Sequence, residues 1–339
     1  MESKTQTLKL QTFASALLLL VLGLFILDGL KPSVSPFKSG NNVQLSLLDT
    51  LPAADVINIK INHAIISPKA KVGLFGDSRS VQVSSKDIGL KNGEFFNFAV
   101  PGTSFRQSSI YLEQLSKIGK VPEIALVNFD NFELQYFPNP THPTAPMRWA
   151  YVWEDVSFGA KHSTLVDTLK IVKRALIVEW EAIIRFFNYE LIVGRLQFAL
   201  SDNDPAMAEA PFLTDGSRRQ RSPSKKVVIS NNFFANAKPN ILLDFMERDL
   251  ARLSGLEARV VVYESPIHPD LAKKLLKQPS QYAHATRKRF LKACKNFKIE
   301  CYTGPVLEKG NNLWVDNSHA PGPILGAYLA QILRSERVE

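Results

Sequence analysis

The sequence predicts an α/β fold: a three-layer α/β/α domain around a central, mostly parallel sheet. Two observations predict it. Short apolar runs typical of buried strands alternate with segments that have helical spacing, which is the pattern of parallel β-α-β units. The runs are also apolar almost throughout rather than at every second residue, as expected for strands covered by helices on both faces.

Five apolar runs predict the strands, and four amphipathic segments predict the helices between and after them. The expected strands are 71–75, 94–100, 123–129, 258–263 and 298–302. The expected helices are 108–119, 241–253, 282–297 and 324–333. The first strand ends at Gly76, and Gly255 is a plausible stop after the second of these helices.

The alternation breaks at a predicted helical insertion, from about 135 to 224. It begins with a proline-rich stretch, 138–146, and continues with a long helix from about 164 to 200. Charges such as Lys170 and Lys173 recur along that helix, so it is not expected to span a membrane. Three roles stay open: a helix packed on the domain, a cap over the active site, or a surface that lies on the membrane or a membrane partner.

The N-terminal run 10–27 is almost wholly apolar and approaches the length that spans a bilayer as a helix. We expect an uncleaved signal anchor at 10–30, although a cleaved signal peptide is an alternative. The predicted layout is a cytoplasmic tail (1–9), this single transmembrane anchor, a linker (31–44) and the domain (45–339). The domain would then face the periplasm or the cell exterior.

Composition limits the partners. Of the 339 residues, 45% are hydrophobic and 22% charged, which is typical of a globular protein. The net charge of +9 is spread along the chain, which fits a diffusely basic surface or attraction to anionic lipid or an acidic polymer. No nucleic-acid-binding motif is present, so nucleic acid is not an expected partner.

Cofactor and metal chemistry have little support in the sequence. Cys294 and Cys301 are the only cysteines, too few for a structural zinc site on their own. They either form a disulfide between a helix end and the next strand, in an oxidising compartment, or remain two buried thiols. No cofactor and no metal are expected.

Two short motifs carry the candidate chemistry. Gly76-Asp77-Ser78 directly follows the first predicted strand, and Asp316-Asn317-Ser318-His319 precedes the last predicted helix. A serine hydroxyl becomes a nucleophile when a base takes its proton, and an imidazole held by a carboxylate is such a base. The motifs therefore predict a catalytic triad of Ser78, His319 and Asp316.

These motifs resemble the blocks of the SGNH/GDSL hydrolase superfamily over residues 70–130 and 255–335. The first block matches as VGLFGDS, ending at Ser78, and the second as NFAVPG, ending at Gly102. The last block matches Asp316 to His319. The family's third block is usually Gly-x-Asn-Asp, whereas this chain has Asn128-Phe129-Asp130-Asn131. An aspartate thus stands where the family has its asparagine.

The resemblance implies an oxyanion hole formed by the backbone N–H groups of Ser78 and Gly102 and by an asparagine amide. An ionised Asp130 accepts hydrogen bonds and cannot donate one, so we expect Asn131 to be the third donor, with Asn128 behind it. Two further residues are candidate substrate contacts: Asp77, beside the nucleophile, and His268, in the loop after the fourth strand.

The anchored, extracytoplasmic layout resembles the branch of the superfamily that contains alginate and teichoic-acid acyl-transfer proteins. That resemblance implies a serine-dependent O-acyltransferase or esterase of the cell envelope, with an acylated glycan or envelope polymer as substrate. A multi-spanning membrane acyltransferase would be its partner. The alternative is a non-catalytic SGNH-like binding or assembly protein of the envelope, which the irregular third block favours.

Overall fold

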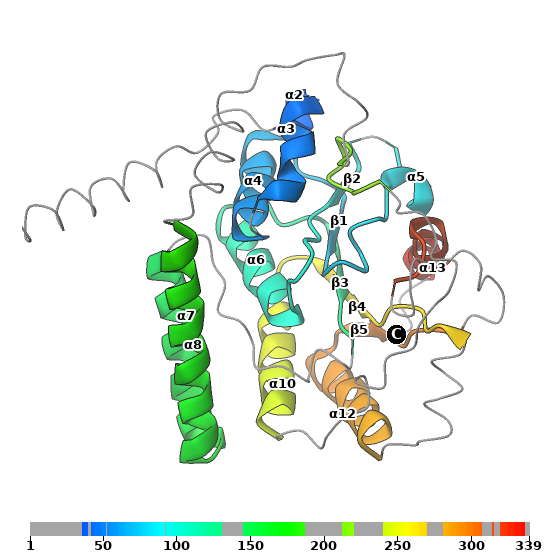
Figure 1. Cartoon of the computed structure of the whole chain (residues 1–339). Helices are drawn as coiled ribbons and strands as arrows, with labels where there is room; N and C mark the ends of the chain where they lie inside the picture. The colour runs from blue at the N-terminus through cyan, green and yellow to red at the C-terminus, as the bar shows by residue number, and fades with distance from the viewer. Residues whose placement is uncertain are drawn as a thin grey trace, which may run out of the picture.

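The computed structural model describes residues 36–39, 42–51, 53–91, 93–130, 145–186, 212–219, 240–269, 281–306, 314 and 319–335 (Figure 1). The predicted tail and anchor lie outside these residues. Within the described parts of the chain, none of the helices is both long and apolar enough to cross a bilayer.

A five-stranded sheet forms the centre of the domain, and every pairing between its strands is parallel. The α/β prediction is therefore confirmed. The strands lie in the order β2 (Phe95–Asn97), β1 (Val72–Phe75), β3 (Ile124–Asn128), β4 (Arg259–Tyr263) and β5 (Glu300–Tyr302). Each corresponds to one of the predicted runs, but β2 ends at Asn97, three residues earlier than expected.

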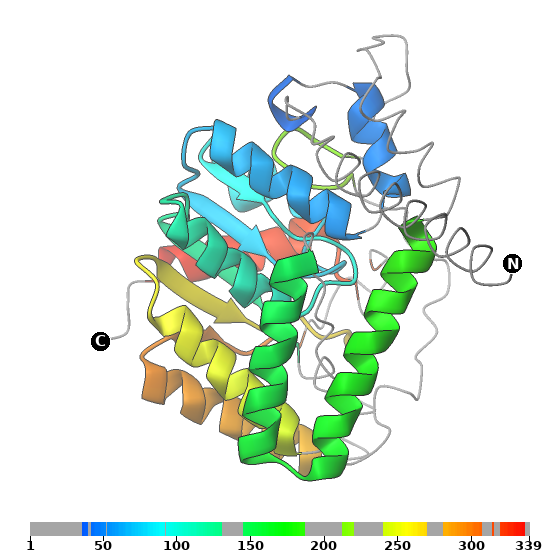
Figure 2. The same ribbon diagram turned by 90° about the vertical axis from the view of Figure 1, so that its left-hand side faces the viewer.

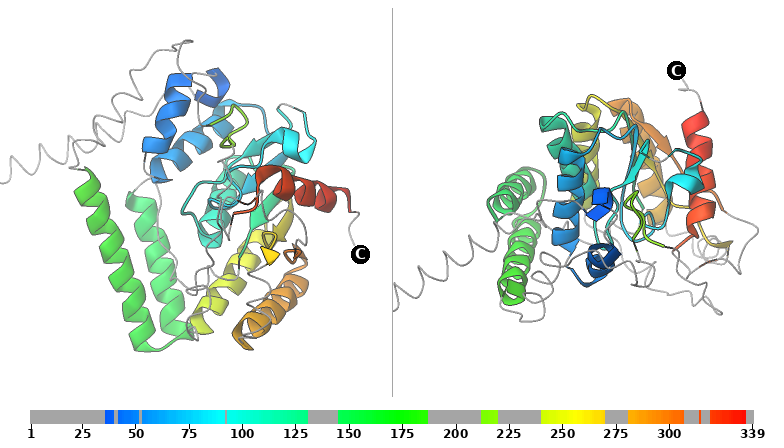
Figure 3. Two further views of the ribbon diagram at one scale, coloured as in Figure 1. Left: turned by 45° about the vertical axis from the view of Figure 1, so that its right-hand side comes forward. Right: turned by 90° about the horizontal axis from the view of Figure 1, so that it is seen from above.

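Helices cover both faces of the sheet, as the view from above shows (Figure 3). One face carries α4 (Ala53–Ile66), α6 (Phe105–Lys117), α10 (Asn240–Ser254) and α12 (Gln281–Phe297). The other carries α5 (Ser85–Ile88) and α13 (Gly322–Arg334). Neighbouring strand residues are buried on opposite faces: Phe75 and Val127 pack in the first core, and Leu74 and Leu126 in the second. This two-sided burial explains why the strand sequences are continuously apolar.

The strand order places a topological switch point at the carboxyl end of β1. The chain passes from β1 to β2 on one side and returns to β3 on the other side of β1. In open parallel sheets, connections that leave in opposite directions open a crevice where ligands bind. Ser78 follows β1 at this point.

The N-terminal boundary differs from the prediction. A short helix, α2 (Pro36–Ser39), lies within the expected linker. A second, α3 (Asn42–Leu47), begins in it, and a 3-10 turn, Leu48–Thr50, follows. Phe37 is buried and packs edge-to-face on Phe96, with ring centroids 5.3 Å apart. The linker is therefore shorter than expected, because Phe37 contributes its aromatic side chain to the core.

The insertion contains a helical hairpin rather than a single long helix. It consists of α7 (Ala145–His162) and α8 (Leu165–Phe186), which pack against each other outside the α4/α6/α10 layer (Figure 2). The prediction missed α7 because its start lies in the proline-rich stretch. Pro146 is the second residue of the helix, and a proline there removes no helical hydrogen bond. Residues 187–200 lie outside the described part of the chain.

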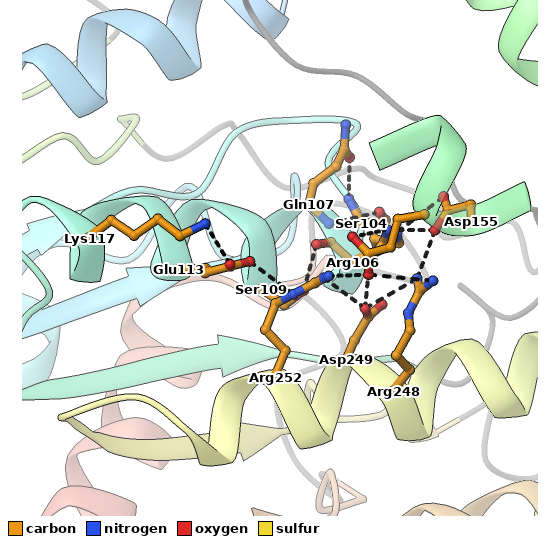
Figure 4. A network of polar contacts seen from close by, with 11 residues as sticks. Ser104, Arg106, Gln107, Ser109, Glu113, Lys117, Asp155, Arg248, Asp249 and Arg252 are labelled. Atoms are coloured by element: carbon orange, nitrogen blue, oxygen red, sulfur yellow. Dashed lines mark hydrogen bonds and ion pairs between the residues drawn. The ribbon is translucent and has the colours of Figure 1, made fainter. Parts of the chain in front are cut away.

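Buried ion pairs join the hairpin to the domain (Figure 4). The guanidinium of Arg106, on α6, lies 2.5 Å from a carboxylate oxygen of Asp155 on α7 and 2.7 Å from one of Asp249 on α10. Arg248 also contacts Asp155, at 2.8 Å. Charges buried in this way require partners, and removing one leaves the others unpaired. The network therefore fixes α7 to α6 and α10.

A disulfide joins Cys294, near the end of α12, to Cys301 on β5, with their Cα atoms 6.1 Å apart. Of the two alternatives from the sequence, the structure has the bridge. It closes a short loop that contains the turn between helix and strand.

Replacing both cysteines with serine should lower the free energy of unfolding by about 2 kcal/mol, the chain-entropy value for so short a loop. Urea denaturation of the two proteins measures the difference. Reductant should lower the stability of the wild type to that of the variant and leave the variant unchanged. If reductant has no effect on the wild type, the thiols are free in the protein.

Candidate functional site

The structure brings together Ser78 and His319, which are 241 residues apart in the sequence. The Nε2 atom of His319 lies 2.8 Å from the Oγ atom of Ser78. Ser78 stands in the turn after β1, and His319 precedes α13. Both side chains are partly exposed. The predicted approach of these two groups is present, at a distance suited to proton transfer.

Close packing at the end of β1 determines where Ser78 stands. A Cβ atom at Gly76 would lie 2.7 Å from both the Cβ of Asn128 and the Oγ of Ser80, so only glycine fits there. The chain then turns, with the Ser80 N–H donating to the Asp77 carbonyl at 3.1 Å. Ser78 is thereby presented at the carboxyl edge of the sheet.

The carboxylate of Asp77 stabilises this turn through its contacts with Arg79. Its Oδ1 accepts a hydrogen bond from the Arg79 N–H at 2.9 Å, and its Oδ2 pairs with the Arg79 guanidinium at 2.5 Å. Burial raises the pKa of Asp77, and the charge of Arg79 opposes that rise. Asp77 was a candidate substrate contact, but its carboxyl group faces the interior and positions the turn that carries Ser78.

The loop that carries Gly102 is attached to the same strand end. The Val100 N–H and the Thr103 hydroxyl both donate to the carbonyl of Gly76, at 3.0 and 2.6 Å. Gly102 is exposed and has a φ of +81°, a conformation that favours glycine. The predicted oxyanion loop thus lies beside the residue that precedes the nucleophile turn.

Asn97 ties the two loops together. Its side-chain amide donates to the carbonyls of Ser80 and Val83, at 2.9 and 2.8 Å, and its Oδ1 accepts the Ala99 N–H at 2.9 Å. In the sequence, Asn97 is part of the second block and has no predicted role of its own. A polar residue inside an apolar strand run was the signal for this bracing function.

Lys60 is a second positioning residue that the sequence did not reveal. Its Nζ atom is buried and donates to three backbone carbonyls, those of Asn97 (2.8 Å), Ala99 (2.7 Å) and Gly216 (2.8 Å). Burial lowers the pKa of Lys60 to about 7, against the attraction of Asp215. Because the side chain of a helical lysine usually faces water, this burial could not be predicted from the sequence.

The third block faces β4. The carboxylate of Asp130 accepts two hydrogen bonds from Ser265, both of 2.9 Å, and pairs with Arg79 at 3.1 Å. The Asn128 amide also donates to the Ser265 hydroxyl, at 3.0 Å. Of the three residues considered for the third oxyanion donor, Asn128 and Asp130 are therefore both engaged with Ser265. Asn131 lies outside the described residues, as does Asp316.

His268 lies inside the protein. Its ring packs edge-to-face against the indole of Trp314, with centroids 5.0 Å apart, and both residues are buried. A substrate would reach His268 only if the chain that covers it moved. Elsewhere in the described residues, no group of three or more His, Cys, Asp or Glu side chains is arranged to hold a metal ion.

Comparison of the chain with protein-family models, curated proteins and solved structures gave no match. The resemblance to the SGNH/GDSL blocks therefore depends on the motifs alone. The contact between Ser78 and His319 is a separate observation, because it follows from the three-dimensional arrangement and not from a family pattern.

Proposed function

We propose that this protein is a membrane-anchored, serine-dependent O-acyltransferase or esterase of SGNH/GDSL type. Its substrate would be an ester-linked acyl group on an extracytoplasmic glycan or envelope polymer. The observation that carries the proposal is the 2.8 Å contact between Ser78 Oγ and His319 Nε2 at the carboxyl edge of a parallel sheet. A partly exposed serine within reach of an imidazole is the arrangement that activates a hydroxyl for attack.

The reaction has two halves. In the first, Ser78 Oγ attacks the ester carbonyl while His319 Nε2 takes the hydroxyl proton, and the collapse of the intermediate returns that proton to the leaving alcohol. In the second, His319 takes a proton from an acceptor hydroxyl, which attacks the acyl-enzyme and releases Ser78. A sugar hydroxyl as acceptor gives transfer, and water gives hydrolysis.

The remaining roles follow from the same proposal. Asp316 would hold the imidazole in the tautomer that accepts the serine proton. The backbone N–H groups of Ser78 and Gly102 would stabilise the oxyanion, with Asn131 as the third donor, because Asn128 and Asp130 are engaged with Ser265. The predicted anchor would hold the site beside a multi-spanning membrane acyltransferase that supplies acyl groups.

A second candidate function is a non-catalytic SGNH-like binding or assembly protein of the envelope. The observation in its favour is Asp130, which stands where the family has its asparagine and whose carboxylate accepts hydrogen bonds from Ser265. A carboxylate near the acyl carbonyl would repel a developing oxyanion unless Arg79 neutralised it.

Labelling with a fluorophosphonate distinguishes the two functions, because this probe reacts only with an activated serine. The full-length folded protein should form one adduct, and mass spectrometry of its peptides should locate that adduct on Ser78. Ser80 is an internal control. It is buried and its hydroxyl is hydrogen-bonded to that of Tyr263, so it should stay unmodified. Heat-denatured protein should not react. If the folded protein forms no adduct at Ser78, the catalytic function is excluded and the non-catalytic binding or assembly function stands.

A further inference from the structure

The helix α8 carries an exposed apolar stripe made of Leu165, Leu169, Leu176 and Trp180. These side chains are 75%, 57%, 56% and 63% exposed, respectively. At 100° per residue they fall within an arc of about 60° on the helix. Contiguous exposed apolar surface of this kind marks a site of contact with another apolar phase. This α8 stripe takes no part in the proposed chemistry.

The α8 stripe points away from α7. Ile171, which is buried, packs against Gly159 of α7, where a Cβ atom would lie only 2.8 Å from the Ile171 Cδ1. Ile171 lies about 150° around the helix from the middle of the stripe. One side of α8 therefore holds the hairpin together, and the opposite side is left open.

The length of chain before the described domain limits what can cover the stripe. Residues 28–35 separate the apolar run 10–27 from Pro36, the first described residue. These residues reach no further than about 30 Å when fully extended. If the run is a membrane anchor, the domain stays at the bilayer surface. Figure 2 shows α2 and α3 lying toward the same end of the domain as the Phe186 end of α8.

The residue types of the stripe fit the boundary between lipid headgroups and acyl chains. Leucine inserts at that boundary, and tryptophan is enriched there because its ring is apolar and its N–H is polar. Lys173, at the border of the stripe, is exposed and can reach lipid phosphates. Lys170, also exposed, pairs with Asp167 at 2.9 Å. Such charges prevent α8 from spanning a bilayer but suit a helix that lies on one.

We propose that the α8 stripe docks on the lipid bilayer, with α8 lying along the membrane surface. The ion pairs of Arg106 transmit this placement to the catalytic domain, because they join α7 to α6, the helix that begins three residues after Gly102. The contact of α8 with the bilayer thereby sets the orientation of the site relative to the membrane. The anchor alone would only limit the distance of the site from the membrane.

Depth-dependent quenching tests the docking. The full chain is reconstituted into vesicles of phosphatidylcholine with one-fifth phosphatidylglycerol, with or without bromine on the acyl chains. The chain has four tryptophans, so the signal of Trp180 is the difference between wild type and Trp180→Phe. We expect bromine to quench that difference signal at least twofold. Equal signals in brominated and plain vesicles overturn the proposal.

A second pair of variants keeps the test independent of the tryptophan change. Leu169→Glu with Leu176→Glu should abolish the quenching of Trp180, because two carboxylates must leave the interface. Ile118→Glu, at an exposed apolar position after α6, should leave it unchanged. The far-UV circular dichroism and the urea midpoint of each variant should match those of the wild type, which shows that the domain is folded. Quenching of Trp180 that survives both leucine substitutions contradicts lipid docking. A change in Trp180 fluorescence that appears only at high protein density in plain vesicles also contradicts it, because it shows contact between protein molecules.

Discussion

Replacing Ser78 with alanine should abolish acyl transfer and leave the fold intact. The hydroxyl of Ser78 lies 2.8 Å from Nε2 of His319, and its removal takes away the proposed nucleophile. Loss of a catalytic serine lowers kcat by a factor on the order of 10³ or more. Hydrolysis of an activated aryl acetate, followed spectroscopically, measures the change. Ser157→Ala, at an exposed position on α7, is the matched control and should retain full activity.

The companion variant His319→Ala should lose activity to a similar extent, and the double variant should be no worse than either single one. Groups that act as one unit in catalysis show such non-additive effects. If Ser78→Ala retains more than about a tenth of the activity, far above what a lost nucleophile permits, the hydrolysis occurs elsewhere. The catalytic proposal then fails.

Replacing Lys60 with methionine should lower the free energy of unfolding by about 3 kcal/mol or more. Methionine fills a similar space but leaves three buried carbonyls without donors, each of which costs about 1–3 kcal/mol. Urea denaturation measures the loss, and Lys69→Met, at an exposed position, should change stability little. Activity should fall as well, because Lys60 supports the loop that leads to Gly102. A loss below about 1 kcal/mol, the value of one ordinary hydrogen bond, would show that the three bonds do not support the fold.

The pH dependence of that difference follows from the pKa of Lys60. The pKa of Lys60 is about 7 in the folded protein and 10.5 in the unfolded chain, where the amine is not buried. Between these two pH values the unfolded chain therefore binds more protons than the folded protein. The contribution of Lys60 to the free energy of unfolding therefore rises as pH increases from 7 toward 10.5. The stability gap between wild type and Lys60→Met should widen from pH 7 to pH 9. A gap that does not change over this range contradicts the lowered pKa.

The sequence predicted those parts of the fold in which local pattern and burial coincide. The strands β1, β3 and β4 were found because both of their faces are buried, so apolar residues fill most of each run. The helix α7 was missed because it begins inside the proline-rich stretch, where no helix was predicted.

In the site, too, only the residues that belong to a local sequence pattern could be predicted. Ser78 and His319 could be identified because their motifs are local in sequence. The roles of Lys60 and Asn97 depend on carbonyls contributed by distant segments, and no periodicity reports such contacts. Asp130 shows a further limit, since its pairing with Arg79 and Ser265 joins the ends of three strands.

The separation of Ser78 and His319 along the chain also determines when the protein first becomes reactive. Ser78 is synthesised 241 residues before His319. Since domains fold progressively from the N-terminus as they emerge, a chain still being made or exported holds a serine without its base. The nucleophile is activated only when α13 closes against α5 and brings His319 to the end of β1. Under the proposed function, acyl chemistry would begin only after this last contact of the fold has formed.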